Sequence, residues 1–138
     1  MVKSDSFHLE TAGQTDILDI TDKVSGCVRT SKIAAGLVNI SVPGSTAGLT
    51  TIEYESGVIE DIKRAFETIA PGNIEYRHDL RWGDGNGYSH VRAALLGPSL
   101  SLPISGGKII LGRWQQIVLI DFDNRPRKRE IIVQMVGD

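Results

Sequence analysis

The sequence predicts an α+β fold, a single-domain sandwich with a mainly antiparallel β-sheet and about three helices. Short extended segments rich in β-branched residues outnumber the segments with helical periodicity. No internal repeat and no Pro/Gly/Ser linker divides the chain. A length of 138 residues suits one domain that needs no disulfide or structural metal. Residues 1–138 are therefore expected to form one domain.

The first elements are two short strands and a helix. Residues 7–11 alternate between apolar and polar side chains, and residues 16–20 form a second extended segment. Thr21 or Asp22 then caps a helix with one apolar face. The residues of that face are Val24, Cys27 and Val28.

An uncharged run from Ile33 to Ile52 is long enough to suggest a membrane span. The segment Pro43–Gly48 interrupts it, and several hydroxyl and amide side chains make it too polar for a lipid core. We interpret the run as two buried strands, 37–42 and 49–55, joined by a polar elbow at 43–48. No membrane association is expected.

The remaining elements are two helices followed by strands. Apolar residues recur at helical spacing over 58–69, and Pro71 and Gly72 end that helix. A shorter helix has Ser89 and His90 in its first turn and ends before Gly97. The expected strands that follow are 101–104, 108–111, 115–122 and 129–136, with a turn at 123–126.

Charge and cysteine content exclude several classes of function. The formal net charge of −2 gives no global basic field for nucleic acid or an anionic membrane. The one basic cluster, 125–129, contains no stacking aromatic residue, so we expect a solvated turn or an anion or subunit contact by one arginine. Cys27 has no partner cysteine, and the first residues do not resemble a secretory signal. A cytoplasmic protein is expected.

The segment Tyr76–His90 contains the densest group of potential ligands. His78 and His90 offer imidazole nitrogens of the kind that zinc binds together with carboxylate or carbonyl oxygens. Asp79 and Asp84 suit a ligand, a partner that orients an imidazole, or a general base. The alternative is a polar surface loop in which the histidines are incidental.

Two further segments suit a binding pocket. The elbow 43–48 combines backbone amides with the hydroxyls of Ser45 and Thr46, which suits a phosphate group, although a simple tight turn explains the same composition. The segment 112–116 places Trp114 beside an arginine and two amides. That tryptophan either lines a pocket or fills the core.

These motifs together resemble the secondary thiamine-phosphate synthase family, and the similarity extends from about Phe7 to Gly137. The order and spacing of six segments carry the resemblance. They are 45–50, Pro71 with 76–78, 84–90, 96–99, 111–115 and 127–129.

The resemblance implies an α+β sandwich, a homotrimer with pockets near its subunit boundaries, and a divalent metal on His78 and His90. The metal is expected to be zinc, or magnesium for a transferase reaction. The implied activity joins a pyrimidine diphosphate to a thiazole phosphate with release of pyrophosphate. The remaining expected site residues are Asp84 and Asn86 at the cation, Arg113 at the pyrophosphate, and Ser45, Thr46, Ser89, Trp114 and Gln115 at the substrate.

One position departs from the resemblance, since Gly44 stands where many members carry a histidine. Two alternative functions use the same residues. One is a metal-dependent phosphatase or other hydrolase, and the other is a non-catalytic trimeric module that binds a phosphorylated metabolite. In each case the expected partner is a small phosphorylated metabolite.

Overall fold

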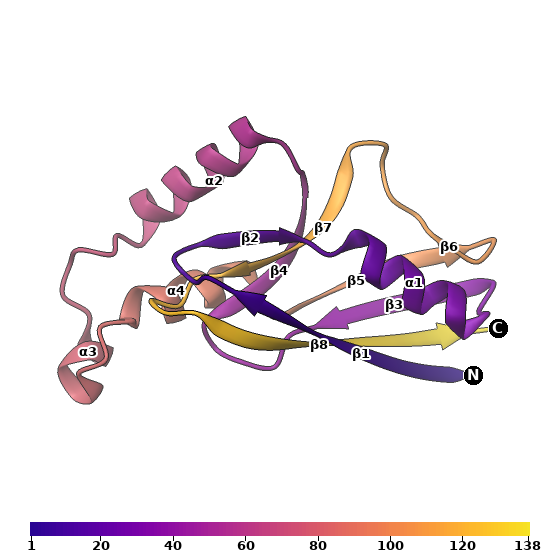
Figure 1. The fold of residues 1–138 in the computed structure, drawn as a ribbon, viewed down its shortest axis with the longest axis horizontal. Helices are drawn as coiled ribbons and strands as arrows, with labels where there is room; N and C mark the ends of the chain where they lie inside the picture. The colour runs from indigo at the N-terminus through magenta and orange to yellow at the C-terminus, as the bar shows by residue number, and fades with distance from the viewer.

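Two antiparallel sheets form the framework of the computed structural model, which describes residues 1–138 (Figure 1). One sheet has five strands in the order β1-β8-β3-β5-β6, and the other has three in the order β2-β7-β4. The strands are β1 (Val2–Thr11), β2 (Asp16–Asp19), β3 (Ala35–Ser41), β4 (Ala47–Glu53), β5 (Ser99–Ser105), β6 (Lys108–Ile109), β7 (Gln115–Asp121) and β8 (Arg127–Gly137). The helices are α1 (Thr21–Ser31), α2 (Ser56–Ile69), α3 (Arg77–Trp82) and α4 (Gly87–Leu96). The predicted α+β class with antiparallel sheets is confirmed.

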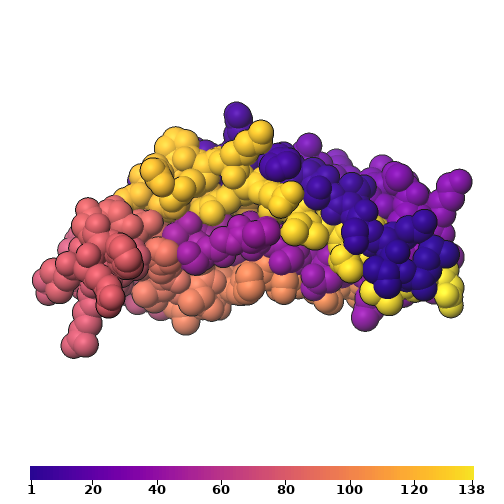
Figure 2. All heavy atoms as spheres, turned by 90° about the horizontal axis from the view of Figure 1, so that it is seen from below, coloured from indigo at the N-terminus to yellow at the C-terminus, as the bar shows by residue number.

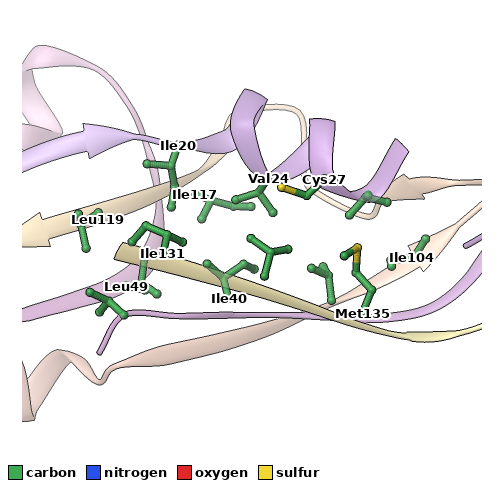
Figure 3. Close-up of a cluster of buried hydrophobic side chains, with 14 of the residues drawn as sticks. Ile20, Val24, Cys27, Ile40, Leu49, Ile104, Ile117, Leu119, Ile131 and Met135 are labelled. Atoms are coloured by element: carbon green, nitrogen blue, oxygen red, sulfur yellow. The ribbon is translucent and has the colours of Figure 1, made fainter. Parts of the chain in front are cut away.

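The main core lies between the two sheets and beneath α1 (Figure 3). Strand β8 shows how alternation builds it, because Ile131, Val133 and Met135 are buried while Gln134 and Val136 are exposed. The predicted face of α1 is confirmed and packs on the same cluster. Other members of the cluster are Ile20, Ile40, Leu49, Ile104, Ile117 and Leu119.

Strand β7 is buried on both faces because it is the central strand of the smaller sheet. Ile117 and Leu119 face the main core, and Val118 and Ile120 belong to a second cluster on the opposite face. Helix α2 covers that second cluster through partly buried side chains that include Phe66, whose ring lies 4.7 Å from the Phe122 ring at 62°. The protein therefore has a third, helical layer outside the smaller sheet.

The polar elbow at 43–48 carries the chain from one sheet to the other. Strand β3 lies in the five-stranded sheet and β4 in the three-stranded sheet, so the chain must turn between layers at this point. Val42 and Ala47 are buried at the two ends of the turn. The interpretation of the uncharged run as two strands is confirmed, and no helix has the length and apolar character required to span a membrane.

The segment Tyr76–His90 differs from the loop expected there, and the structure has four helices rather than about three. Helix α3 occupies its first half and α4 begins at Gly87. Gly83 and Gly85, with φ of 73° and 70°, provide the left-handed turn that ends α3 and reverses the chain. A helix of six residues is too short for its periodicity to be visible in the sequence. Figure 2 shows this region at one end of the elongated molecule, opposite the N-terminal strand.

The Cys27 thiol is expected to be a poor nucleophile at neutral pH. Burial, together with the negative charge of Asp5, raises its pKa from 9.0 to about 11. Because the raised pKa delays thiolate formation, the alkylation rate of the folded protein by iodoacetamide should rise about tenfold per pH unit from pH 8 to pH 10. Glutathione serves as the control, because the rate of an exposed thiol levels off above its ordinary pKa of about 8.5. A rate for Cys27 that levels off below pH 9 would contradict this assignment.

Candidate metal and anion site

An open pocket of about 390 Å³ lies where α3, α4, the elbow and the start of β8 meet. It contains most of the site residues expected from the sequence. Its ten lining residues are Gly44, Ser45, Thr46, His78, Trp82, Asp84, Asn86, His90, Arg127 and Arg129.

The two predicted histidines come together in this pocket. The turn between α3 and α4 places the His78 and His90 rings 4.3 Å apart between centroids, tilted by 40°. Nδ1 of His78 lies 3.3 Å from a carboxylate oxygen of Asp79 and 3.3 Å from one of Asp84. The potential ligand atoms of His78, Asp79 and Asp84 all lie within 4.8 Å of one another. One cation can reach all three groups at this spacing when Nδ1 of His78 carries no proton.

The two carboxylates have different roles in the fold. Oδ1 of Asp79 accepts a hydrogen bond of 2.8 Å from the backbone N–H of Gly87, so Asp79 fixes the start of α4. In the tautomer of His78 that carries its proton on Nδ1, the same oxygen accepts from the ring and orients it. Asp84 lies in the exposed turn and accepts no hydrogen bond from the backbone. Its carboxylate is therefore the one free to bind a cation.

The environment of His90 favours its neutral form. Burial, and then the positive charge that His78 can carry, lower the pKa of His90 below its ordinary value. A neutral imidazole has a free nitrogen lone pair, which is the form that binds metals. The neighbouring histidines are thus suited to bind a cation through their ring nitrogens.

Asn86 provides an unpaired acceptor beside the histidines. The side chain is only 6% exposed, and its amide N–H donates to Oδ1 of Asp123 over 3.3 Å. Since Asp123 is an acceptor, this contact fixes the orientation of the amide group. The carbonyl oxygen Oδ1 of Asn86 is the single buried side-chain polar atom that has no hydrogen-bond partner. A buried acceptor without a donor is costly, and a bound cation would satisfy it.

A buried network of arginines and aspartates forms the floor of the pocket. Asp121 and Asp123 are fully buried. Arg129 is only 8% exposed. Its guanidinium donates two hydrogen bonds, of 2.7 and 2.9 Å, to the carboxylate of Asp121 and a third, of 2.6 Å, to the Thr46 hydroxyl. Arg127 donates to Asp123 over 2.8 Å. This network joins the elbow to the start of β8.

Hydrogen bonding keeps the second buried carboxylate ionised. Burial alone would raise the pKa of Asp123, but hydrogen bonds to its carboxylate outweigh burial and hold the pKa below the ordinary value. The donors are Asn86, the backbone N–H of Asn124, Thr46 and Arg127. The floor therefore carries two negative charges matched by two guanidinium groups.

Gly44 leaves the guanidinium of Arg129 open to the pocket. The backbone of Gly44 has φ of 142°, and a Cβ atom there would lie 3.0 Å from Nη1 of Arg129. Nη1 donates none of the hydrogen bonds of the network, so its N–H groups are available to a ligand. A side cavity of about 220 Å³ shares Gly44, Ser45 and His90 with this pocket. Its other walls are Ala47, Ala93, Ala94 and Pro98.

Some of the predicted site residues do not meet in this pocket. Ser89 is buried, and its hydroxyl donates to the carbonyl of Asn86 within α4. Arg113 stacks on Trp114, 4.9 Å from its ring centroid, and Trp114 is 64% exposed, so within this chain it neither fills the core nor lines the site. Gln115 donates to Thr51 on β4.

The four residues of this buried network were not predicted as site residues, namely Asp121, Asp123, Arg127 and Arg129. One pattern in the sequence could have indicated them. Two aspartates stand two positions apart at the end of one expected strand, and two arginines stand two positions apart near the start of the next. The basic cluster was expected to be a solvated turn or to provide one arginine contact. Arg125 and Lys128 are exposed as expected of a turn, but Arg129 is buried.

Comparison with known proteins matches residues 5–138 to the family described as UPF0047 protein YjbQ-like. A UPF0047 protein of Archaeoglobus fulgidus is 40% identical over 126 residues, which cover 91% of this chain and 95% of the relative. A UPF0047 protein of Mycobacterium tuberculosis is 34% identical, with 96% of this chain and 97% of the relative covered. The crystal structure of a YbjQ-like protein of unknown function from Sulfolobus solfataricus has a TM-score of 0.95 at 33% identity and covers 100% of this chain and 99% of its own.

These matches correct the family and activity expected from the sequence. The matching family model and the names of the relatives are those of UPF0047 proteins, so the assignment to the secondary thiamine-phosphate synthase family is wrong. The predicted joining of a pyrimidine diphosphate to a thiazole phosphate rested on that assignment and has no support in these matches. The geometry of the pocket does not depend on it.

Proposed function

This chain belongs to the UPF0047 protein YjbQ-like family, and from its pocket we propose that it binds a divalent cation together with the phosphate group of a small metabolite. The observation that carries the proposal is the unpaired, buried Oδ1 of Asn86 in the pocket that both histidines line. A cation is the partner that satisfies this oxygen and both imidazoles at once.

The donor types favour zinc as the cation. His78 and His90 contribute imidazole nitrogen, Asp84 contributes carboxylate oxygen, and Asn86 contributes amide oxygen. Zinc takes such mixed nitrogen and oxygen sets, whereas magnesium prefers oxygen alone and retains several waters. Zinc is therefore the metal proposed for this site.

The phosphate is proposed to bind between the cation and Arg129. The free Nη1 group, the Ser45 hydroxyl and the open backbone at Gly44 lie along one wall of the pocket. Guanidinium N–H groups are strong donors to phosphate oxygens. A cation held by the histidines, which line the same pocket, would polarise the same phosphate, and the side cavity of about 220 Å³ has room for part of the attached group.

The charges around the pocket indicate that the cation binds first. Asp79, Asp84, Asp121 and Asp123 contribute four negative charges within the site and its floor, against two positive charges from Arg127 and Arg129. This excess attracts a divalent cation and repels a dianion. A bound cation cancels the excess, so phosphate affinity should depend on metal.

This dependence is tested by titrating the protein with phenyl phosphate in a calorimeter, with zinc chloride at one equivalent or with excess EDTA. We expect zinc to tighten phenyl phosphate binding at this site by about tenfold or more, as cancelling two charges at short range implies. Calcium chloride serves as a control cation with little preference for imidazole. Equal affinity in zinc and in EDTA would contradict the proposal.

The expected homotrimer and cytoplasmic location stay predictions. Several large apolar side chains are exposed in different segments of the chain, and exposed apolar residues that are scattered singly are normal on a protein surface. The exposed side chains include Trp82, Leu95, Ile110 and Trp114.

A further inference from the structure

A second cavity, of about 470 Å³, lies between α2, α4 and the loop from β1 to β2. Tyr88 and Arg92 of α4 line this cavity, whereas Asn86 and His90 line the metal and anion site. Two residues along a helix correspond to about 200° of rotation, so these pairs point to opposite sides of α4. The cavity is thus separated from the histidines by the body of the helix. Its lining residues are Gln14, Thr15, Lys63, Arg64, Glu67, Gly72, Tyr88 and Arg92.

The lining of this cavity is positively charged. Lys63, Arg64 and Arg92 face a single acid, Glu67, and the only hydrophobic lining residue is Tyr88. Arg64 also pairs with Asp61 over 3.0 Å, but both side chains are largely exposed and such a pair is weak. The cavity therefore lacks the acidic groups that a metal ion would need and has the surplus of cations that an anion requires.

Arg92 is the buried cation of the cavity, since its side chain is only 5% exposed. Its position is fixed by hydrogen bonds. Its guanidinium donates to the carbonyl of Ala70, to Thr15 and to Glu67, over 2.9, 3.0 and 2.7 Å. The Tyr88 ring lies 4.8 Å beneath it and helps to fix its plane. A guanidinium has five N–H groups, so two remain for a ligand after these three bonds.

Glu67 does not neutralise the rest of the cavity. Its carboxylate is held by Arg92 and by the backbone N–H of Gly72, over 2.7 and 3.0 Å. These bonds lower the pKa of Glu67, the bond from Gly72 most strongly, so the group stays ionised and paired with Arg92. Lys63 and Arg64 are left as the unneutralised charges.

The loop from β1 to β2 is held in a strained conformation at this cavity. Gln14 and Thr15 have φ of 59° and 62°, a left-handed conformation that residues other than glycine rarely adopt. The hydroxyl of the buried Thr15 accepts the bond from Arg92 in this conformation. Strain of this kind persists only where surrounding contacts enforce it, and it is concentrated at ligand sites.

We propose that this cavity is a second anion site, which binds a phosphate group through Arg92, Lys63 and Arg64 without a metal ion. The proposal is independent of the histidine site because the two cavities share no lining residue. Phosphate is the favoured class because three cations with a fixed guanidinium match an oxyanion that carries two charges.

The test is equilibrium dialysis of the protein against radiolabelled inorganic phosphate in excess EDTA, where the histidine site has no cation. We expect one phosphate per chain with a dissociation constant of about 1 mM or tighter. Replacing both exposed cations, Lys63→Ala with Arg64→Ala, should weaken binding at least tenfold. The matched control is Lys3→Ala with Lys23→Ala, which removes the same charge from exposed positions outside the cavity and should leave binding unchanged.

Amide chemical shifts identify where the phosphate binds. In the same buffer, phosphate should move the resonances of Gly72 and Gln14 and leave that of Ser45 in place. No saturable binding in EDTA, equal binding by the Lys63 and Arg64 variant, or shifts centred on Ser45 would each overturn the proposal. The first two results bear on this cavity alone and leave the zinc dependence expected at the histidine site untouched. Shifts centred on Ser45 would instead place metal-free phosphate in the histidine pocket, so the failure of one proposal is distinguishable from the failure of the other.

Discussion

Replacing Arg129 with alanine is expected to lower the free energy of unfolding by about 3–5 kcal/mol. The change leaves the fully buried Asp121 with only the Thr11 hydroxyl, which donates to it over 2.6 Å, and one backbone N–H. It also removes the donor to Thr46 and so loosens the elbow. A loss of this size is a large part of the total free energy of unfolding, which is about 5–15 kcal/mol for a typical domain.

Guanidinium chloride denaturation at pH 7 measures this loss. The matched control is Lys128→Ala, because Lys128 is the preceding residue on β8 but is exposed, and its replacement should change stability by less than about 0.5 kcal/mol. If Arg129→Ala fails to fold, Arg129→Lys, which keeps the charge but loses the paired hydrogen bonds, should be intermediate. If Arg129→Ala lowers the free energy of unfolding by less than about 1 kcal/mol, the network does not make the contribution to stability that we assign to it.

Replacing both His78 and His90 with alanine is expected to lower zinc affinity by at least about 100-fold, because two of the four proposed ligands are lost. The fold should persist, since the two rings share a contact with each other and their nearest ionic partners are partly exposed. Competition against a chelating dye of known zinc affinity measures the change.

The control for the histidine pair is His8→Ala. His8 lies on β1, largely exposed and 3.8 Å from Glu130, and lines neither cavity. Its replacement should leave zinc affinity unchanged. A double variant that binds zinc as tightly as the His8 variant would show that the histidines are not the ligands.

Local patterns predicted most of the elements because those elements have apolar faces. The face of α1 and the alternation on β8 are visible in the sequence and are buried as expected. The start of β1 was not predicted, because Val2 pairs with Val136 where both side chains are exposed. Pairing at an exposed sheet end depends on the partner strand and leaves no hydrophobic pattern.

The histidine half of the site could be predicted, and the arginine half could not. His78 and His90 stand in one glycine-rich segment whose composition indicates a site. Arg127 and Arg129 fall on the inward face of β8, and Lys128 falls on the other face. The sequence does not show that these two arginines meet Asp121 and Asp123, because β7 and β8 lie in different sheets. The segment around Trp114 has the composition of a pocket wall, yet its strand starts away from the site.

The central claim is that one zinc ion binds between the two histidines and the oxygens of Asp84 and Asn86. It is tested most directly by anomalous diffraction at the zinc edge, from crystals grown with zinc chloride at neutral pH. We expect one strong peak in each chain, about 2.0–2.2 Å from a ring nitrogen of His78, a ring nitrogen of His90, a carboxylate oxygen of Asp84 and Oδ1 of Asn86. A peak only at other residues, or none while Oδ1 of Asn86 is bound by water, would contradict the claim.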